Sequence, residues 1–422
     1  MRILIATDAF PPNCGGSGWS TWELARGLRD RGHAIDLVQP RPGTSGIRSR
    51  EYDGFTIEEF GAAAPPVPFV RNYFKNERLF PALEGHLLER LTRERPDIVH
   101  AQHVLTATPA IFAARKADVP VVVTVRDYWP VCYWATLIVD PAIDELCPAC
   151  SAAGMRRCLQ GRAGPLWPLA APMIPYMQAN LARKRTALAS ANAVIAVSGQ
   201  IGRDLLARAP ELRETRLEIV PNPFDLASLE QVARSAPPPR TDPYALYVGK
   251  LEANKGADLL PRTAHAARLR MPLIVVGDGS LRSSIEREAR ELGVDLQVTG
   301  WVSREAALGW MAASAFVVFP SRGPESLSRV LVEASALGIP TAAMDTGGTR
   351  DIIEPDRTGL LSTDKAGLVR DVRRLAEDQP LRHRLGAAAA SHARARFDAR
   401  RVVARIESIY DELVTSSRGT RP

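Results

Sequence analysis

Residues 315–338 read AFVVFPSRGPESLSRVLVEASALG: an apolar run, a short polar loop and then an amphipathic segment. The run Ala315–Pro320 predicts a strand that is buried on both faces. The segment Ser328–Gly338 predicts a helix, whose first backbone amides are unpaired and can donate to phosphate oxygens. The stretch therefore predicts one strand–loop–helix unit of a parallel α/β sheet.

The same unit recurs in both halves of the chain. Further strands are predicted at Arg2–Asp8, Ala34–Gln39, Asp97–Ala101, Pro120–Val125, Ala193–Ser198, Leu217–Pro221, Tyr244–Val248, Pro272–Val276, Leu296–Thr299 and Thr341–Met344. Helices are predicted between them, at Trp19–Arg31, Leu79–Glu94, Thr108–Lys116 and Tyr176–Ala189. Such alternation is typical of parallel sheets covered by helices on both faces.

The stretch Ser235–Pro243, SAPPPRTDP, interrupts the alternation, and a chain of 422 residues is long enough for two domains. We expect two doubly wound, Rossmann-like α/β domains, 1–234 and 244–398, that face each other across a cleft. We also expect the last segment, 399–422, to form a helix that packs back on the N-terminal domain.

The composition is that of a soluble globular protein, with 45% hydrophobic and 24% charged residues and a net charge of +7. Arginines are spread over nearly every predicted helix, with acidic residues between them, and no basic stripe carries aromatic side chains. We therefore expect no nucleic-acid partner. The chain has no long apolar run, so we expect a cytoplasmic protein, with peripheral contact to the inner face of the membrane as an alternative.

An insertion at about 132–177 does not follow the alternation. Its uncharged part, Ala163–Ala182, contains four prolines that exclude a continuous helix. Apolar residues such as Leu166 and Trp167 either lie on a membrane interface, line an acceptor groove, or pack against the first domain.

Four of the five cysteines fall in or beside this insertion. They are Cys132, Cys147, Cys150 and Cys158. Four thiolates could form a closed structural zinc site, although only one pair has the two-residue spacing of a zinc hook. Plain thiols or redox pairing are the alternatives.

Two glutamates separated by seven residues, Glu325 and Glu333, are the sharpest chemical signal. Glu325 lies in a strand-to-helix turn, at the mouth of the predicted cleft. Glu333 lies among apolar residues, where a carboxylate is costly unless a donor reaches it, and a ribose diol would supply two donors. A capping box does not explain Glu333, because the residue three before it is Val330.

Three glycine-containing turns follow predicted strands. Gly249–Gly256 carries Lys250 and Lys255, which suit a diphosphate, although the loop is not a Walker motif. Gly277 lies in a Gly-Asp-Gly turn, and the first strand is followed by Gly15 and Gly16. These turns lack side-chain bulk where a backbone could approach a ligand closely.

Together these motifs and the turn Thr346-Gly347-Gly348 resemble the family 4 glycosyltransferases of GT-B fold, over essentially the whole chain. The resemblance implies a retaining glycosyltransferase of glycan biosynthesis, which moves a sugar from a nucleoside-diphosphate sugar to a hydroxyl of a lipid, glycan or metabolite. It implies no bound metal and no further cofactor. The resemblance implies that the donor phosphate and sugar contact Gly15 and Gly16, and that the diphosphate contacts Lys250 and Lys255, with Gly277 in the adjoining turn. It also implies that Glu325 and the amides of Leu327 and Ser328 contact the sugar. Glu333 would contact the ribose.

Three departures from the family's pattern matter. Lys250 replaces the usual arginine, and Ser326-Leu327 replaces Phe-Gly. Arg126 stands where the family often carries a histidine that touches the donor sugar; we expect it to act with Glu325 and Lys255, on the leaving phosphate or on the acceptor. His100 or His103 could compensate. A glycoside phosphorylase and a non-catalytic protein that binds a sugar nucleotide remain alternatives.

Overall fold

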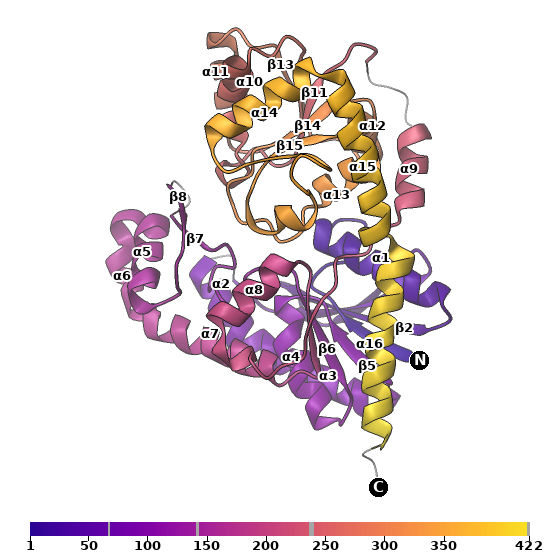
Figure 1. The fold of residues 1–422 in the computed structure, drawn as a ribbon. Coiled ribbons are helices and arrows are strands. Elements are labelled where there is room, and N and C mark those ends of the chain that lie inside the picture. Colours follow the sequence, from indigo (N-terminus) through magenta and orange to yellow (C-terminus); the bar gives the residue numbers. More distant parts are fainter. Residues whose placement is uncertain (66–67, 141–142, 236–239, 420–422) are drawn as a thin grey trace.

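The structure, a computed structural model, describes residues 1–65, 68–140, 143–235 and 240–419. It contains two large sheets, each covered by helices and each forming its own α/β domain, with the C-terminal domain above the N-terminal one in Figure 1. The predicted fold class, two Rossmann-like domains, is confirmed.

The N-terminal sheet has eight strands. In pairing order they are β10 (Leu217–Ile219), β9 (Ala193–Ala196), β6 (Val121–Val125), β5 (Ile98–Ala101), β1 (Arg2–Ala6), β2 (Ala34–Pro42), β4 (Phe55–Ala62) and β3 (Ile47–Tyr52). All pairs are parallel except β3 with β4. The sequence did not predict this edge hairpin, because β3 is polar and largely exposed instead of apolar.

Helices cover both faces of this sheet. They include α1 (Gly16–Asp30), α2 (Pro68–Phe74), a π-helical turn (Lys75–Leu79), α3 (Phe80–Glu94), α4 (Val104–Lys116), α7 (Ile174–Ala189) and α8 (Gly199–Arg208). The strands contribute fully buried apolar side chains on alternate faces, such as Leu4 on one face and Ile5 on the other.

The C-terminal sheet has six parallel strands. In pairing order they are β13 (Leu296–Gly300), β12 (Leu273–Val276), β11 (Ala245–Val248), β14 (Phe316–Phe319), β15 (Thr341–Met344) and β16 (Leu360–Ser362). Its helices are α10 (Leu260–Ala267), α11 (Arg282–Glu291), α12 (Arg304–Ala312), α13 (Arg329–Ala336), α14 (Lys365–Glu377) and α15 (Gln379–Phe397).

The chain crosses between the domains at two neighbouring points. Phe224 N–H donates to Phe397 O, and Ala399 N–H donates to Phe224 O. Helix α9 (Leu226–Ser235) follows the first crossing and packs against α12 of the C-terminal domain. The expected linker Ser235–Pro243 therefore comes after the crossing, because the apolar side of α9 already contacts the second domain. Residues 236–239 of this linker lie outside the described residues.

The last helix, α16 (Ala399–Gly419), lies along the N-terminal domain (Figure 1). Its Val403 packs so closely on Gly27 of α1 that a Cβ there would lie 2.7 Å from Val403 Cγ2. Tyr410 is fully buried, and its hydroxyl is hydrogen-bonded to His100 Nδ1. The other ring nitrogen, His100 Nε2, lies 2.7 Å from Thr124 Oγ1.

The insertion forms a lobe beside the N-terminal domain (Figure 1). It contains the hairpin β7 (Ile138–Asp140) and β8 (Ile143–Leu146), followed by the short helices α5 (Ala152–Ala163) and α6 (Trp167–Ala170). Turns of 3-10 helix at prolines separate the helices, in line with the expected helix breaks. Among the helices that the structure describes, none is both long and apolar enough to cross a membrane.

The expected zinc site is not supported. Cys132, Cys147 and Cys158 are buried, and no group of three metal-ligating side chains comes together within the described residues. Instead, Cys147 and Cys158 pack with Val139 in an apolar cluster, and Cys132 is hydrogen-bonded to Cys150. The four thiols therefore contact apolar side chains or each other, and are not arranged as metal ligands.

Tyr410→Phe tests the anchoring of α16. Removal of the hydroxyl leaves one nitrogen of the buried His100 without a partner, which we expect to lower the free energy of unfolding by about 1–3 kcal/mol. Tyr73→Phe, at a ring that is 45% exposed, is the matched control. Chemical denaturation followed by tryptophan fluorescence measures both, and equal stability of the two variants would contradict the anchoring role.

Candidate functional site

Lys255 and Glu325 form the centre of the site. Lys255 Nζ lies 2.7 Å from Glu325 Oε1, which also accepts a hydrogen bond of 2.6 Å from Ser321 Oγ. Lys255 ends a 3-10 turn after β11, and Glu325 lies in the loop after β14. The two neighbouring loops thus bring together a cation and a carboxylate that are far apart in sequence.

Two close backbone contacts hold these loops in place. Gly256 has φ 69°, and a Cβ there would lie 1.9 Å from Pro320 O, so only glycine fits. Gly348 N–H donates to Glu325 O at 2.6 Å. A Cβ on Gly347, which has φ 53°, would lie 2.2 Å from the same oxygen. The glycine pair therefore supports the backbone of Glu325.

Helix α13 begins beside Glu325. Ser328 is its N-cap, and Ser328 Oγ accepts from Leu331 N–H at 3.4 Å. The backbone N–H groups of Leu327 and Ser328 have no acceptor among the described residues. They are therefore free to donate to an anion near the helix N-terminus, where the helix dipole favours negative charge.

Glu333 is buried, and two arginines reach it. Arg304 Nη2 lies 3.2 Å and Arg329 Nη2 3.5 Å from Glu333 Oε1. These guanidinium groups explain why a carboxylate is tolerated there, so its burial alone is no evidence for a ribose. Neither arginine was predicted to reach Glu333, although Arg329 precedes Glu333 by four residues, the spacing that places two side chains on one helix face.

Arg329 also joins the two domains. Its guanidinium lies 3.1 Å from Glu23 Oε1 and 3.2 Å from Ser20 Oγ, both on α1 of the N-terminal domain. Burial raises the pKa of Glu23, and the positive charge of Arg329 opposes that rise. The start of α13 is thus ion-paired to α1 across the domain boundary.

The first glycine loop faces this contact. A Cβ on Gly15 would meet no atom within 4 Å, whereas a Cβ on Gly16 would lie 3.0 Å from Arg329 Cδ. Gly15 is the N-cap of α1 and makes no side-chain cap. The space above Gly15 is therefore open to a ligand, and Gly16 packs against Arg329.

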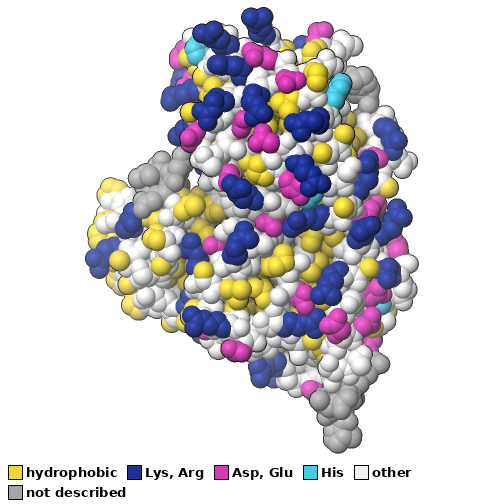
Figure 2. All heavy atoms as spheres, viewed as in Figure 1, with side chains coloured by type: hydrophobic (Ala, Val, Ile, Leu, Met, Phe, Trp, Pro, Cys, Tyr) yellow, Lys and Arg dark blue, Asp and Glu magenta, His cyan; other side chains and the backbone are white. Residues whose placement is uncertain are grey.

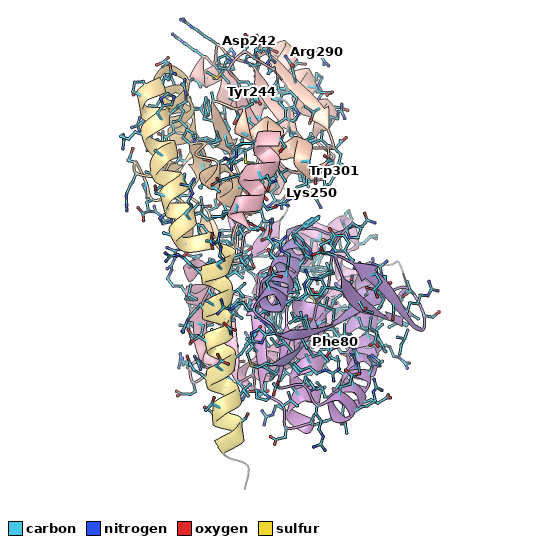
Figure 3. All side chains as sticks on the ribbon, turned by 90° about the vertical axis from the view of Figure 1, so that its right-hand side faces the viewer. Phe80, Asp242, Tyr244, Lys250, Arg290 and Trp301 are labelled. Atoms are coloured by element: carbon cyan, nitrogen blue, oxygen red, sulfur yellow. The ribbon has the colours of Figure 1, made fainter. Side chains whose placement is uncertain are left out.

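The remaining C-terminal positions lie at the edge of the sheet. Gly277 has φ 144°, and a Cβ there would lie 1.9 Å from Gly249 O, so this glycine is required by the packing of the two turns. Lys250 is exposed at the margin of the domain that faces the N-terminal domain (Figure 3). Trp301 directly follows β13, at the same margin, and is 80% exposed. No sequence signal had singled it out.

Arg126 lies inside the N-terminal domain and not on an open surface. Only 7% of it is exposed. Its guanidinium donates to Asn222 Oδ1 at 2.9 Å and to Gln102 O at 2.7 Å. These bonds orient the group within the protein.

The two histidines differ in their surroundings. His100 is fully buried between Tyr410 and Thr124, and burial lowers its pKa to about 3, so it is a neutral structural residue. His103 caps α4 and lies between two carboxylates, 3.5 Å from Asp8 and 3.3 Å from Asp127. His103 therefore lies just beyond β5, at the carboxyl end of the strands.

Several known proteins are similar to this chain. Glycogen synthase from Mycobacterium tuberculosis is 27% identical, covering 100% of this chain and 96% of its own length. The GDP-mannose-dependent alpha-mannosyltransferase of the same species is 26% identical, over 86% of this chain and 83% of its own. Among solved structures, sucrose-phosphate synthase from Thermosynechococcus elongatus has a TM-score of 0.71 at 17% identity, covering 99% of this chain and 100% of its own. HepE from Anabaena, in complex with UDP, has a TM-score of 0.65 at 18% identity, and the match covers 98% of this chain and 100% of HepE.

The family matches cover both domains. Residues 230–392 match the family described as Glycosyl transferases group 1. Residues 14–228, half of the chain, match the family described as Glycosyltransferase Family 4. Both matches agree with the resemblance that the glutamate pair, the lysine loop and the glycine turns indicated. The protein is a glycosyltransferase and belongs to glycosyltransferase family 4.

Proposed function

We propose that the protein is a retaining glycosyltransferase that moves a sugar from a nucleoside-diphosphate sugar to an acceptor hydroxyl. The Lys255–Glu325 contact beside the unpaired amides of Leu327 and Ser328 carries this proposal. The names of the relatives, among them a GDP-mannose-dependent enzyme, and the UDP complex of HepE support a nucleotide-linked donor.

In this proposal the donor lies between Gly15 and the start of α13. Lys255 and the amides of Leu327 and Ser328 contact the diphosphate and sugar, and Glu325 accepts hydrogen bonds from sugar hydroxyls. Lys250 adds a charge at the margin of the site. Glu333 accepts from the ribose through Oε2, to which no hydrogen bond is made within the described residues; both arginines contact Oε1.

The proposed reaction needs no protein nucleophile. The bond from the anomeric carbon to the diphosphate oxygen breaks, and the acceptor oxygen bonds to that carbon from the same face, so the configuration is retained. The acceptor proton passes to the departing diphosphate. Lys255 and the helix amides stabilise the charge that develops on that leaving group. Arg126 contributes its buried positive charge and orients Gln102 and Asn222.

Glu325→Gln and Lys255→Met test the centre of the site. We expect each to lower kcat for sugar transfer by about 10²–10³-fold, the loss typical when one group that stabilises a developing charge is removed. Lys365→Met, at an exposed lysine of the same domain, is the control and retains activity. Full turnover in both site variants would exclude the proposed roles.

Thermal unfolding in the presence of UDP, GDP, ADP or dTDP identifies the donor base, because a ligand that binds the native state raises the melting temperature. An unchanged melting temperature with all four nucleotides would contradict a nucleotide donor.

Trp301 provides a surface on which the donor base can stack. It is 80% exposed and follows Gly300, whose carbonyl accepts from Gly277 N–H at 3.0 Å. Trp301→Ala should raise the Kd of the preferred nucleoside diphosphate about ten-fold, because stacking of one base on an aromatic ring contributes about 1–3 kcal/mol. Phe112→Ala, at another exposed ring, should leave Kd unchanged. Calorimetric titration measures both, and an unchanged Kd in Trp301→Ala would remove Trp301 from the base site.

We further propose that the insertion lobe contacts an anionic membrane surface. Leu146, Leu166 and Leu169 are 56%, 66% and 80% exposed. Residues 146–177 of the lobe contain no aspartate or glutamate and carry three arginines, Arg156, Arg157 and Arg162. Exposed apolar side chains also gather on this lobe in Figure 2. Apolar residues with a basic surround are typical of proteins that bind anionic bilayers.

Leu166→Ser combined with Leu169→Ser tests this contact. We expect the double variant to sediment less with vesicles of phosphatidylcholine and phosphatidylglycerol in equal parts, because each exposed leucine contributes apolar burial in the bilayer. Leu206→Ser, at an exposed leucine of α8, is the control. Equal sedimentation of the double variant and the wild type would contradict the membrane contact.

A further inference from the structure

A pocket of about 170 Å³ lies in the N-terminal domain. Among the residues that line it are Leu105 and Trp129, which follow β5 and β6. Leu105 N–H donates to the Asp8 carboxylate at 3.1 Å, at the end of β1. The carboxyl ends of parallel strands meet at one edge of a sheet, so the pocket shares this edge with the Gly15–Gly16 loop. Its volume is below that of pockets for whole ligands, so it suits one part of a larger molecule.

Two lysines from different elements line this pocket. Lys184 of α7 is 8% exposed, and its ammonium lies 5.9 Å from the centre of the Tyr133 ring. Lys75 lies in the π-helical turn after α2. Burial lowers the pKa of Lys184 to about 8, and the charge of Lys75 contributes to this shift, so the two ammonium groups lie within electrostatic range of each other.

The surrounding charges do not neutralise the lysine pair. Arg71 lies within electrostatic range of Lys75, and Arg183 within that of Lys184, so both add positive charge. Asp8 lies within electrostatic range of Lys75, and Asp127 within that of Lys184. Both carboxylates have other partners, since Asp8 accepts from Leu105 N–H and Asp127 accepts from Trp129 N–H at 2.8 Å. Both also face His103. Within the part of the chain that the structure describes, neither ammonium makes a hydrogen bond or an ion pair.

A desolvated ammonium without a carboxylate is costly, and a bound anion would offset that cost. Two lysines together present six N–H donors, which suits the several oxygens of a phosphate. Asn72 and Asn76 add amide groups on the same side. Trp129 and Tyr133 supply aromatic walls against which a sugar ring can pack.

We propose that this pocket binds a phosphate group of the acceptor, so that the acceptor is a phosphorylated sugar or polyol. The proposal rests on the glycosyl transfer proposed above, because it assigns the second substrate of the same cleft. Lys75 and Lys184 hold the phosphate, and the aromatic walls direct the adjoining ring toward the edge of the sheet where the donor sugar lies.

The test measures binding of glucose 6-phosphate, glucose and inorganic phosphate by calorimetry. We expect the wild type to bind glucose 6-phosphate, with inorganic phosphate as a competitor, and to bind glucose at least about ten-fold more weakly. Lys184→Met and Lys75→Met should each weaken glucose 6-phosphate binding about ten-fold. Lys116→Met, at an exposed lysine paired with Glu84, should leave it unchanged. Lys75 is only half-buried, so Lys75→Met provides a readout even where Lys184→Met disturbs the fold.

Titration with the preferred nucleoside diphosphate separates the two proposals. Nucleotide binding together with equal affinity for glucose and glucose 6-phosphate would overturn the phosphate pocket and leave the transferase function standing. Lysine-dependent phosphate binding without any nucleotide binding would support the pocket and contradict the proposed donor. Vesicles that contain phosphatidylinositol phosphate distinguish a lipid source: lysine-dependent binding to them, without binding of glucose 6-phosphate, assigns the phosphate to a lipid head group. No lysine-dependent binding of any of these probes overturns the proposal.

Discussion

The buried guanidinium of Arg329 fixes the relation between the two domains at the site. It lies between Glu23 of α1 and Glu333 of its own helix, and Glu23 is only 3% exposed. Removal of one partner from such a group leaves a desolvated charge, which is far more costly than the loss of an exposed ion pair. The contact also sets how closely α13 approaches Gly16. The separation of α1 and α13 therefore depends on this side chain, while Asp351, which accepts from the N–H groups of Gly199 and Gln200, joins the domains at a second point.

Near the chain crossings the two domains meet both through apolar packing and through charged groups. The crossings at Phe224 and Phe397–Ala399 are hydrogen-bonded to each other, and the Arg329 guanidinium lies 4.5 Å from the centre of the Phe224 ring. Closely spaced crossings with apolar contact are typical of a hinge. The Arg329 ion pairs lie directly beside these crossings, so the charged contact and the apolar contact hold the same part of the domain boundary.

Local sequence predicted the elements that are apolar and continuous. The family resemblance singled out Lys255 and Glu325, but it did not predict their contact. Strand β14 and helix α13 follow from a periodicity that lies within 24 residues. The Arg329–Glu23 pair could not be predicted in this way, since its partners are 306 residues apart and belong to different domains. The β3–β4 hairpin was missed because its outer strand has no apolar run. The cysteine spacing suggested a metal, but spacing alone does not show how side chains pack, and apolar contacts with Val139 decided the outcome.

The insertion lobe connects the lysine pocket of the N-terminal domain to the two loops that carry Glu325 and Lys255. Its hairpin reaches the C-terminal domain, where Ile138 Cδ1 lies 3.6 Å from the position that a Cβ of Gly323 would take. Gly323 N–H donates to Asn254 O at 2.9 Å, so the contact falls on the two loops that carry Glu325 and Lys255. On the N-terminal side the same insertion begins at Tyr133, a wall of the lysine pocket. A shift of the lobe, whether through an acceptor or a membrane, would therefore act on both sides of the cleft at once.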